Sequence, residues 1–384
     1  MTQPLPKACE PIQFVDLAAQ QRLIRTELDE AIRRVLDHGA YVMGPEVTQL
    51  ENELSAFCGA KYVLSCASGT DALALVLMAK QIKTGDAVFV PSFTFAATAE
   101  VVAWLGATPV FIDVLPDTFN MDPESLKLGI QAAKQAGLRP AAIIPVDLFG
   151  QAADYNALEP IAAENHLWIL SDAAQSFGGT YQNRKVGTIG LATATSFFPS
   201  KPLACYGDGG AVFTDDADMY NVLKSIRVHG QGEDKYENVR IGMNGRLDTL
   251  QAVVLLEKLK LFSKEIKQRQ AVADIYSQTL HDFVQTPFVQ KGSQSAWAQY
   301  TVLLPDNIDR NVFANRLKAA GVPTAVYYPK PLHQQIAYQG FLKATPSLTV
   351  SEKLSQQVIS LPMHPYLQRA QQDHILAQCI EALK

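Results

Sequence analysis

Short apolar runs that alternate with helical segments occupy residues 62–214 of this chain and constrain its fold most strongly. Strands that are apolar on both faces are typical of sheets covered by helices on both sides. The expected strands are residues 62–66, 87–90, 110–113, 143–146, 167–172, 193–197 and 211–214. Helical patterns lie between several of them, at residues 71–82, 96–105, 123–136 and 154–164. The sequence therefore predicts an α/β fold, in which ligands bind beyond the carboxyl ends of the strands.

Two further helical patterns lie outside this alternating region. One covers residues 17–37, with Gly39 as a stop signal, and the other runs from Leu247 to about Leu280. Because the second pattern exceeds the usual length of a helix, we expect it to bend and to lead into a second domain. The expected division is an N-terminal arm at 1–13, a large domain at 14–255 and a small C-terminal domain at 256–384.

The C-terminal part of the sequence predicts a smaller α/β unit. Asp309 is a candidate N-cap for a helix that ends at Gly321. Residues 322–328 have the composition of a strand, and residues 371–383 have the pattern of a closing amphipathic helix.

Composition and charge exclude several classes of protein. The net charge of −5 gives no basic surface of the kind that binds nucleic acid or anionic lipid. The five cysteines are scattered without CxxC spacing, and the seven histidines lack metal-ligand spacing, so we expect neither a disulfide framework nor a metal site. The N-terminus lacks the apolar core of a signal peptide, and no run approaches the roughly 20 apolar residues of a membrane helix. We therefore expect a cytoplasmic protein.

Lys201 lies between an expected strand and the glycine-rich run at 207–210, and Asp172 ends the strand at 167–172. Taken singly, such residues are usually a solvated charge and a turn cap. A lysine in a desolvated cleft, however, has a lowered pKa and can act as a nucleophile. Together the two residues are what a pyridoxal phosphate enzyme needs, because the amine binds the cofactor aldehyde and the carboxylate keeps the pyridine nitrogen protonated. Gln175, just after Asp172, is a candidate partner of the cofactor's phenolic oxygen.

Two other segments supply candidate contacts to such a cofactor. Gly69 and Thr70 precede a helical run and form a potential phosphate site at its N-terminus. An ordinary helix cap at Ser68 or Thr70 explains the same pattern equally well. Phe95 follows the strand at 87–90 and can stack on a flat heteroaromatic ring, whereas a packed core aromatic is the alternative.

Arg246 directly precedes the long helical pattern. A guanidinium at this position can clamp a carboxylate of a substrate. An ion pair at the helix start is the alternative, and spacing alone favours it.

Taken together, these motifs resemble the DegT/DnrJ/EryC1/StrS sugar aminotransferases, a family of fold-type I pyridoxal phosphate enzymes. The resemblance extends from the run FVDL at residues 14–17 to the run LPMHPY at residues 361–366. It implies a large domain with a seven-stranded, mostly parallel sheet between helices and a small C-terminal α/β domain. It also implies a homodimer with shared active sites.

The resemblance implies roles for the residues expected around the cofactor ring. Lys201 is expected to bind the cofactor covalently, with Asp172 at the pyridine nitrogen, Gln175 at the phenolic oxygen and Phe95 stacked on the ring. Some relatives have histidine in place of the lysine and act as dehydratases, so Lys201 argues against that activity.

The resemblance also implies how the cofactor phosphate is held. Gly69, Thr70 and Ser196 are expected to bind the phosphate within one subunit, and Asn244 is expected to reach the phosphate of the neighbouring subunit's cofactor.

Several stretches, including residues 196–210 and 246–252, are similar to a narrower group that acts on UDP-2-acetamido-2-deoxy-3-oxo-glucuronate. In that group the arginine that matches Arg246 meets the sugar carboxylate across the dimer interface. A histidine–tyrosine pair also lines the sugar site of the group, whereas Tyr327 and Tyr328 stand there in this chain. Tyrosine is bulkier than histidine and uncharged near neutral pH, so the pair alters the expected sugar pocket.

We therefore expect a pyridoxal phosphate-dependent transaminase that converts a keto group on a UDP-linked sugar to an amine, with L-glutamate as donor, in O-antigen or lipopolysaccharide biosynthesis. One alternative is an aminotransferase for another ketosugar, such as a dTDP-keto-deoxysugar. Others are an amino-acid transaminase, decarboxylase or dehydratase of the same fold. A regulatory protein that binds the cofactor without turnover is the last alternative, and the chain carries no helix-turn-helix or basic appendage to support it.

Overall fold

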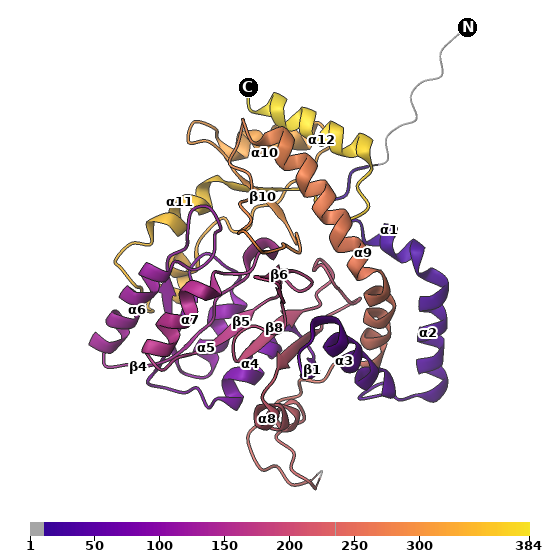
Figure 1. Ribbon diagram of the computed structural model, residues 1–384, viewed down its shortest axis with the longest axis vertical. Helices are drawn as coiled ribbons and strands as arrows, with labels where there is room; N and C mark the ends of the chain where they lie inside the picture. The colour runs from indigo at the N-terminus through magenta and orange to yellow at the C-terminus, as the bar shows by residue number, and fades with distance from the viewer. Residues whose placement is uncertain (1–10, 235) are drawn as a thin grey trace.

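The computed structural model describes residues 11–234 and 236–384, so most of the expected N-terminal arm at 1–13 lies outside the described residues. Within these residues, seven strands form one sheet in the order β1-β9-β8-β5-β4-β2-β3 (Figure 1). The strands are β1 (Tyr62–Cys66), β2 (Asp86–Pro91), β3 (Thr108–Ile112), β4 (Arg139–Ile143), β5 (Trp168–Asp172), β8 (Ala192–Ser196) and β9 (Gly210–Thr214). Strand β9 pairs antiparallel with β1 and β8, and the other pairs are parallel. The mostly parallel sheet predicted from the sequence is confirmed.

Helices cover both faces of this sheet. They include α3 (Pro45–Cys58), α4 (Gly69–Ala79), α5 (Ala97–Trp104), α6 (Pro123–Gln135), α7 (Tyr155–Glu164) and α8 (Ala217–Arg227). Before them, α1 (Leu17–Leu23) and α2 (Arg25–His38) lie beside the long helix at residues 249–280 (Figure 1). The expected single helix at 17–37 divides at Ile24, which leaves helical geometry and turns its side chain into the interior. The stop at Gly39 is confirmed, since this glycine adopts the left-handed conformation with φ of 70°.

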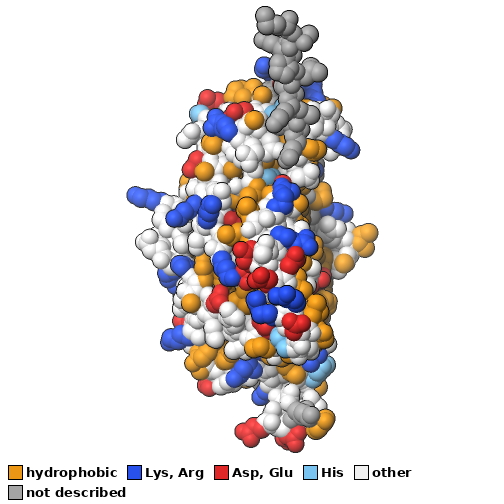
Figure 2. All heavy atoms as spheres, turned by 90° about the vertical axis from the view of Figure 1, so that its right-hand side faces the viewer, with side chains coloured by type: hydrophobic (Ala, Val, Ile, Leu, Met, Phe, Trp, Pro, Cys, Tyr) orange, Lys and Arg blue, Asp and Glu red, His pale blue; other side chains and the backbone are white. Residues whose placement is uncertain are grey.

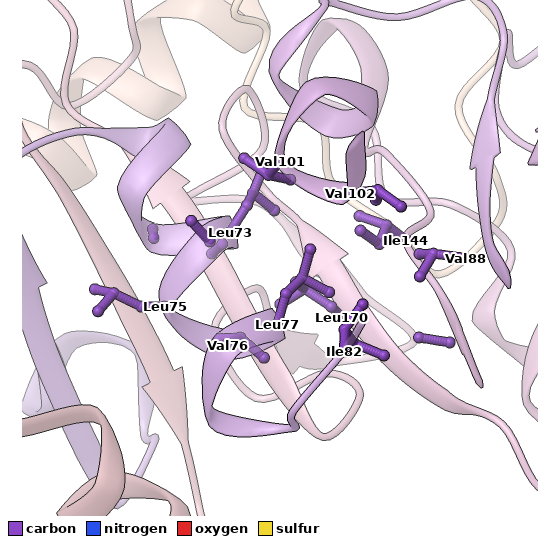
Figure 3. Close-up of a cluster of buried hydrophobic side chains, with 14 of the residues drawn as sticks. Leu73, Leu75, Val76, Leu77, Ile82, Val88, Val101, Val102, Ile144 and Leu170 are labelled. Atoms are coloured by element: carbon purple, nitrogen blue, oxygen red, sulfur yellow. The ribbon is translucent and has the colours of Figure 1, made fainter. Parts of the chain in front are cut away.

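Alternate residues of each strand pack on opposite faces, as the period of two in a strand requires. Val88 of β2 and Leu170 of β5 pack against α4 and α5 in one apolar cluster (Figure 3). Their neighbours Phe89 and Ile169 face the other side and pack against α6 and α7. Burial on both faces explains why the strands are continuous apolar runs in the sequence.

Helix α9 (Thr249–Leu280) connects two apolar cores. Its N-terminal half contributes Val254 and Leu255 to a core shared with α3 and β9, and its C-terminal half contributes Val272 and Tyr276 to a separate core. That second core also contains the short sheet of β10 (Tyr300–Leu303) and β11 (Val358–Leu361), with α10 (Arg310–Ala319) and α12 (Arg369–Ala382). The expected domain boundary at residues 255 and 256 falls inside α9 and stays a prediction.

The expected strand at 322–328 is wrong. Only Ala325 pairs there, in an isolated antiparallel bridge with Ser360 of β11. Pro323 has no N–H to donate to a ladder, which limits strand pairing in this segment. The segment instead leads Tyr327 and Tyr328 towards the end of the large sheet, where Tyr328 lies near Phe93.

The remaining elements are short or lie near the C-terminus. They are β6 (Thr180–Tyr181), β7 (Arg184–Lys185), α11 (Thr349–Gln357) and the 3-10 helices Leu148–Gly150, Leu332–Gln334 and Ile336–Tyr338. Within residues 11–234 and 236–384, no helix combines the length and apolar character needed to cross a membrane.

Candidate active site

Asp172 ends β5 at the carboxyl edge of the sheet, and its carboxylate is held by two donors. The Thr98 hydroxyl of α5 donates to Oδ2 at 2.9 Å, and the Ala174 N–H donates to Oδ1 at 3.2 Å. Burial raises the pKa of Asp172, while these hydrogen bonds and the positive charge of Lys201 act in the opposite direction. Burial is the larger effect, so the pKa is raised overall, and the hydrogen bonds and Lys201 offset part of the cost of the charged form.

Lys201 lies in the loop between β8 and β9. The backbone of Phe197 fixes this loop, because its N–H donates to the Gly209 carbonyl at 2.7 Å and its carbonyl accepts from the Cys205 N–H at 2.8 Å. Burial lowers the pKa of Lys201, and the charge of Asp172 raises it. Each side chain shifts the pKa of the other, so the structure brings Lys201 and Asp172 within electrostatic range in one buried site.

The segment between β1 and α4 packs unusually closely on β8 and β9. Ser68 caps α4 by accepting a hydrogen bond from the Asp71 N–H at 3.0 Å, so the capping alternative is confirmed for Ser68. A Cβ atom on Gly69 would lie 2.6 Å from the Cβ of Ser196, and one on Gly210 would lie 2.3 Å from the Ser68 carbonyl oxygen. Only glycine permits this approach, which places the Ser196 hydroxyl beside the N-terminal turn of α4. Such an arrangement fits a phosphate group.

Thr70 also lies in the first turn of α4 and is partly buried. Because Ser68 caps the helix, the Thr70 hydroxyl takes no part in the capping hydrogen bond.

Aromatic side chains border the same edge of the sheet. Phe95 is 58% exposed, so the alternative of a packed core aromatic is wrong. Its ring centroid lies 6.4 Å from that of Tyr328, whose hydroxyl accepts a hydrogen bond from Gln175 Nε2 at 3.3 Å. Gln175 Oε1 accepts from the Phe149 N–H at 2.6 Å. Tyr327 is half-buried, with its ring centroid 6.3 Å from that of Phe14. Of these aromatic residues, Phe95 has the exposed ring, which lies beyond the carboxyl end of β2 and is free to stack on a ligand.

Asn244 and Arg246 lie in the segment between α8 and α9, and this segment packs beside the loop of Gly69. The Gly245 carbonyl accepts from the Ala67 N–H at 3.1 Å, and the Gly245 N–H donates to the Arg227 carbonyl at 3.0 Å. Asn244 is exposed and Arg246 is partly exposed. Among the residues that the structure describes, Arg246 makes no ion pair within 4.0 Å, so the structure gives no support to the ion-pair alternative.

Asp147 lies next to the site and was not identified from the sequence. It follows β4 and is fully buried, accepting hydrogen bonds from the Tyr155 hydroxyl at 2.7 Å and the Ser176 hydroxyl at 2.6 Å. Its backbone N–H donates to the Asp172 carbonyl at 3.0 Å. Burial raises the pKa of Asp147 to about 6. The signal was available, because Asp147 follows an apolar strand just as Asp172 ends one.

The arrangement fits pyridoxal phosphate. The glycine-lined approach of α4 to Ser196 suits the phosphate, and the buried carboxylate of Asp172 suits a protonated ring nitrogen. A desolvated lysine amine with a lowered pKa suits covalent capture of an aldehyde. The fold and the site define a pyridoxal phosphate-dependent transferase of fold type I.

Comparison with known proteins narrows this class. The sequence model of the DegT/DnrJ/EryC1/StrS aminotransferase family matches residues 22–380. The chain belongs to this family, which confirms the resemblance inferred from its motifs and the assignment of pyridoxal phosphate as cofactor.

Two curated relatives match nearly the whole chain. The UDP-2-acetamido-2-deoxy-3-oxo-D-glucuronate aminotransferase of Pseudomonas aeruginosa is 49% identical, covering 94% of this chain and 97% of the relative. The dTDP-3-amino-3,4,6-trideoxy-alpha-D-glucose transaminase of Streptomyces venezuelae is 36% identical, covering 94% of this chain and 93% of the relative. Among solved structures, a DegT DnrJ EryC1 StrS aminotransferase from Brucella abortus matches with a TM-score of 0.94 and 50% identity, covering 96% of this chain and 99% of that one.

Proposed function

We propose that this protein transfers an amino group from glutamate to the keto carbon of a UDP-linked sugar in O-antigen or lipopolysaccharide biosynthesis. UDP-2-acetamido-2-deoxy-3-oxo-glucuronate is the favoured substrate. The observation that carries the proposal is the electrostatic coupling of Lys201 and Asp172 in one buried site at the carboxyl edge of the sheet. The choice of sugar rests on the relative from Pseudomonas aeruginosa at 49% identity.

The residues around the ring would act by holding charge and orientation. When bound, the cofactor supplies an electron sink for breaking the bond between the α-carbon and hydrogen of the amino donor. The Asp172 carboxylate, held by Thr98, would keep a proton on the ring nitrogen. The amine of Lys201 would bind the cofactor between turnovers and would carry a proton at the substrate carbon during turnover, which its lowered pKa favours. Phe95 would cover one face of the ring, and Gln175 would contact the phenolic oxygen.

The phosphate would be held where α4 meets β8. The first-turn N–H groups of α4, with Gly69 and Thr70, and the Ser196 hydroxyl provide the donors. Holding the phosphate would keep the cofactor in the site when it is not bonded to Lys201. Asn244 of the second subunit would add a further contact.

A homodimer with shared active sites is part of this proposal. Tyr41, Val42 and Met43 are exposed apolar residues next to the start of α9, where Val42 pairs with Asp248 and the Tyr41 carbonyl accepts from the Thr249 N–H at 2.9 Å. Apolar side chains also lie among the charged ones on the face that carries α1 and α2 (Figure 2). An exposed apolar group beside Arg246 supports burial of this region against a second copy, from which Arg246 would reach the sugar carboxylate.

The cysteines are compatible with a reducing compartment. Cys58, Cys66, Cys205 and Cys379 are free and buried, and burial raises the pKa of each thiol. Disulfides are rare in such compartments. This supports the proposal of a cytoplasmic enzyme.

The direct test uses the purified holoenzyme with glutamate and UDP-2-acetamido-2-deoxy-3-oxo-glucuronate. We expect stoichiometric 2-oxoglutarate and a product in which NH₂ and H replace the carbonyl oxygen at C3, identified by mass spectrometry. A dTDP-linked ketosugar serves as the comparison substrate, because the relative from Streptomyces venezuelae is named for such a sugar. Faster turnover of the dTDP-sugar would overturn the choice of UDP-glucuronate, and absence of 2-oxoglutarate with either sugar would overturn the proposed reaction.

Mixed dimers test whether the active sites are shared. On the carboxylated sugar, Lys201→Ala subunits are expected to be inactive and Arg246→Met subunits to be strongly impaired. If Arg246 serves the partner's site, mixing them under conditions of subunit exchange restores part of the activity, since one of the two sites then has both residues. Mixtures without any recovery would contradict the shared site.

A further inference from the structure

A small cavity lies beside the loop that carries Lys201, on the side of α1 and α9. Its volume is about 20 Å³, enough for about one water molecule. It is bordered by the N-terminal segment before α1, the middle of α9 and the segment that follows β11. The polar side chains on its wall include Asp16, Lys201, Glu265, Arg269, His364 and Tyr366.

His364 is the unexplained member of this wall. Its side chain is 3% exposed, and neither ring nitrogen makes a hydrogen bond of normal geometry among residues 11–234 and 236–384, although the Gln13 backbone lies close enough to raise the pKa of the ring. Buried polar atoms in native proteins nearly always have a partner, from the protein or from an ordered water. The Gln13 backbone can serve at most one of the two nitrogens, so a buried imidazole on the wall of a water-sized cavity indicates a bound water at the other.

The neighbouring polar groups are already engaged. Glu265 accepts hydrogen bonds from Gln20 Nε2 at 2.8 and 3.1 Å and from the Tyr366 hydroxyl. Arg269 donates to the Trp297 carbonyl at 3.0 Å and to the Met363 carbonyl at 3.2 Å. The Lys201 amine, in contrast, makes no hydrogen bond within the part of the chain that the structure describes. Asp16 Oδ1 accepts from the Ala19 N–H at 2.8 Å. His364 and Lys201 are thus the polar side chains of this wall that make no hydrogen bond of normal geometry in the described part of the chain.

The imidazole of His364 is neutral at physiological pH. Burial and the charge of Arg269 lower its pKa to about 4, against the opposing effects of Asp16 and of the Gln13 backbone. A neutral imidazole has one N–H donor and one acceptor nitrogen. The ring can therefore either donate a hydrogen bond to a water or accept one from it. Because it is uncharged, it places no second positive charge beside the lysine amine.

We propose that one ordered water in this cavity links His364 to the Lys201 amine, which makes His364 a positioning residue for the lysine when it is not bonded to the cofactor. The inference rests on the proposed role of Lys201. A released lysine has a flexible four-carbon stem, and ordering it for return to the cofactor costs conformational entropy. A water-mediated tether keeps the amine near the position from which it must react.

Capture of pyridoxal phosphate by the apoenzyme tests this directly. The Lys201 amine condenses with the cofactor aldehyde, so that a C=N bond replaces the C=O bond and one water is released. The rate is followed by growth of the visible absorbance band that borohydride removes. We expect His364→Phe, which fills the cavity and removes both nitrogens, to slow capture roughly 3- to 10-fold, the effect of about one net hydrogen bond. His364→Asn keeps a donor and an acceptor and is expected to stay within about twofold of the native rate.

Two controls separate positioning from a purely structural role. His374→Phe changes an exposed histidine of α12 whose ring hydrogen-bonds to the Ala320 carbonyl at 2.9 Å, and is expected to leave capture unchanged. In a Lys201→Ala background, His364→Phe is expected to leave non-covalent affinity for pyridoxal phosphate unchanged, because its effect acts through the lysine. If the phenylalanine variant does not fold, His364→Leu, which is close to histidine in volume, takes its place.

The outcomes distinguish the two proposals. Native capture rates in the Phe or Leu variant would overturn the role of His364, as would an equal loss of non-covalent affinity in the Lys201→Ala background. Wild-type protein without a borohydride-sensitive band, or a Lys201→Ala variant that keeps it, would overturn the proposed function and this inference with it.

Discussion

Thr98 in the first turn of α5 donates its hydroxyl hydrogen bond to the Asp172 carboxylate at the end of β5, at 2.9 Å. Both side chains are buried, and the two residues are 74 positions apart in the chain. This hydrogen bond lowers the pKa of a carboxyl group that burial raises. Thr98 therefore determines how far into the acidic range Asp172 remains ionised.

Replacing Thr98 by valine should move the acidic limb of activity towards higher pH. The hydrogen bond favours the charged form of Asp172, so its loss raises the pKa, and the carboxylate is protonated at a pH where the native residue is still ionised. We expect kcat to fall roughly tenfold at mildly acidic pH, the effect of about 1.4 kcal/mol, and less at pH 8. Thr98→Ser keeps the hydroxyl and should retain the native pH–rate profile. Identical profiles for the valine variant and the native enzyme would contradict this role.

Lys201→Ala should retain the fold but lose turnover. Removal of a positioned proton carrier alone costs about 10²–10⁴-fold, and the loss of covalent cofactor binding adds to this. Circular dichroism and thermal unfolding check the fold, and release of 2-oxoglutarate measures turnover. Lys267→Ala, at an exposed lysine of α9, is the matched control. Native turnover in the Lys201 variant would show that another group does the chemistry.

Gly69→Ala should weaken cofactor binding through a steric clash that can be relieved. The new Cβ would lie 2.6 Å from the Cβ of Ser196, so the first turn of α4 must move away from β8. We expect the dissociation constant for pyridoxal phosphate to rise at least about tenfold, consistent with the usual cost of overpacking. The double variant Gly69→Ala/Ser196→Gly removes the clashing atom and should recover part of the affinity.

The control for this pair is Gly340→Ala. A Cβ at Gly340 meets no atom within 4 Å, so this substitution should leave cofactor affinity unchanged. If the double variant binds the cofactor more weakly than Gly69→Ala, the Ser196 hydroxyl matters more than the clash.

Arg246→Met should impair only substrates that carry a sugar carboxylate. Loss of a charge-assisted hydrogen bond should reduce kcat/KM for the glucuronate substrate by roughly 10- to 100-fold. The half-reaction with glutamate, followed by loss of the visible band, should be nearly unchanged. The matching UDP-sugar without the carboxylate is the control substrate. Equal losses with both sugars would remove Arg246 from carboxylate recognition.

Asp147→Asn should destabilise the protein more at pH 4 than at pH 7. Burial raises the pKa of Asp147 from 3.8 to about 6, so between these values the folded state binds more protons than the unfolded state. The contribution of Asp147 to stability is thus fully present below about pH 4 and is lost as pH rises through 6, by up to about 3 kcal/mol. Asparagine does not titrate, so the destabilisation caused by the substitution shrinks over this window. Urea unfolding of both proteins at pH 4, 5, 6 and 7 measures it, and a difference that grows with pH would contradict the assignment.

Much of the large sheet was predictable because each strand is a local apolar run with burial on both faces. Val88 and Phe89 are neighbours in the sequence and both are buried, on opposite faces, so no long-range information was needed to recognise β2. The strand expected at 322–328 failed for the complementary reason. Its composition suits a strand, but Pro323 and the available partner β11 allow pairing only at Ala325.

The residues of the candidate site also differ in whether the sequence alone could identify them. Lys201, Asp172, Gly69 and Phe95 were recognisable because strand ends and glycine-rich turns carry local signals. The partners that tune them were not recognisable, because Thr98 and His364 stand in segments without any such signal.

The amino-acid sequence by itself determined the order of strands and helices, the family and the residues that follow each strand, since all of these depend on patterns within short windows. The tertiary structure alone decided which distant groups meet: Thr98 with Asp172, Ser196 with Gly69, and His364 with the cavity beside Lys201. Such contacts depend on how the packed layers approach one another, and no local pattern encodes that distance. The electrostatic balance of the site, in which burial and hydrogen bonds oppose each other, follows from this packing.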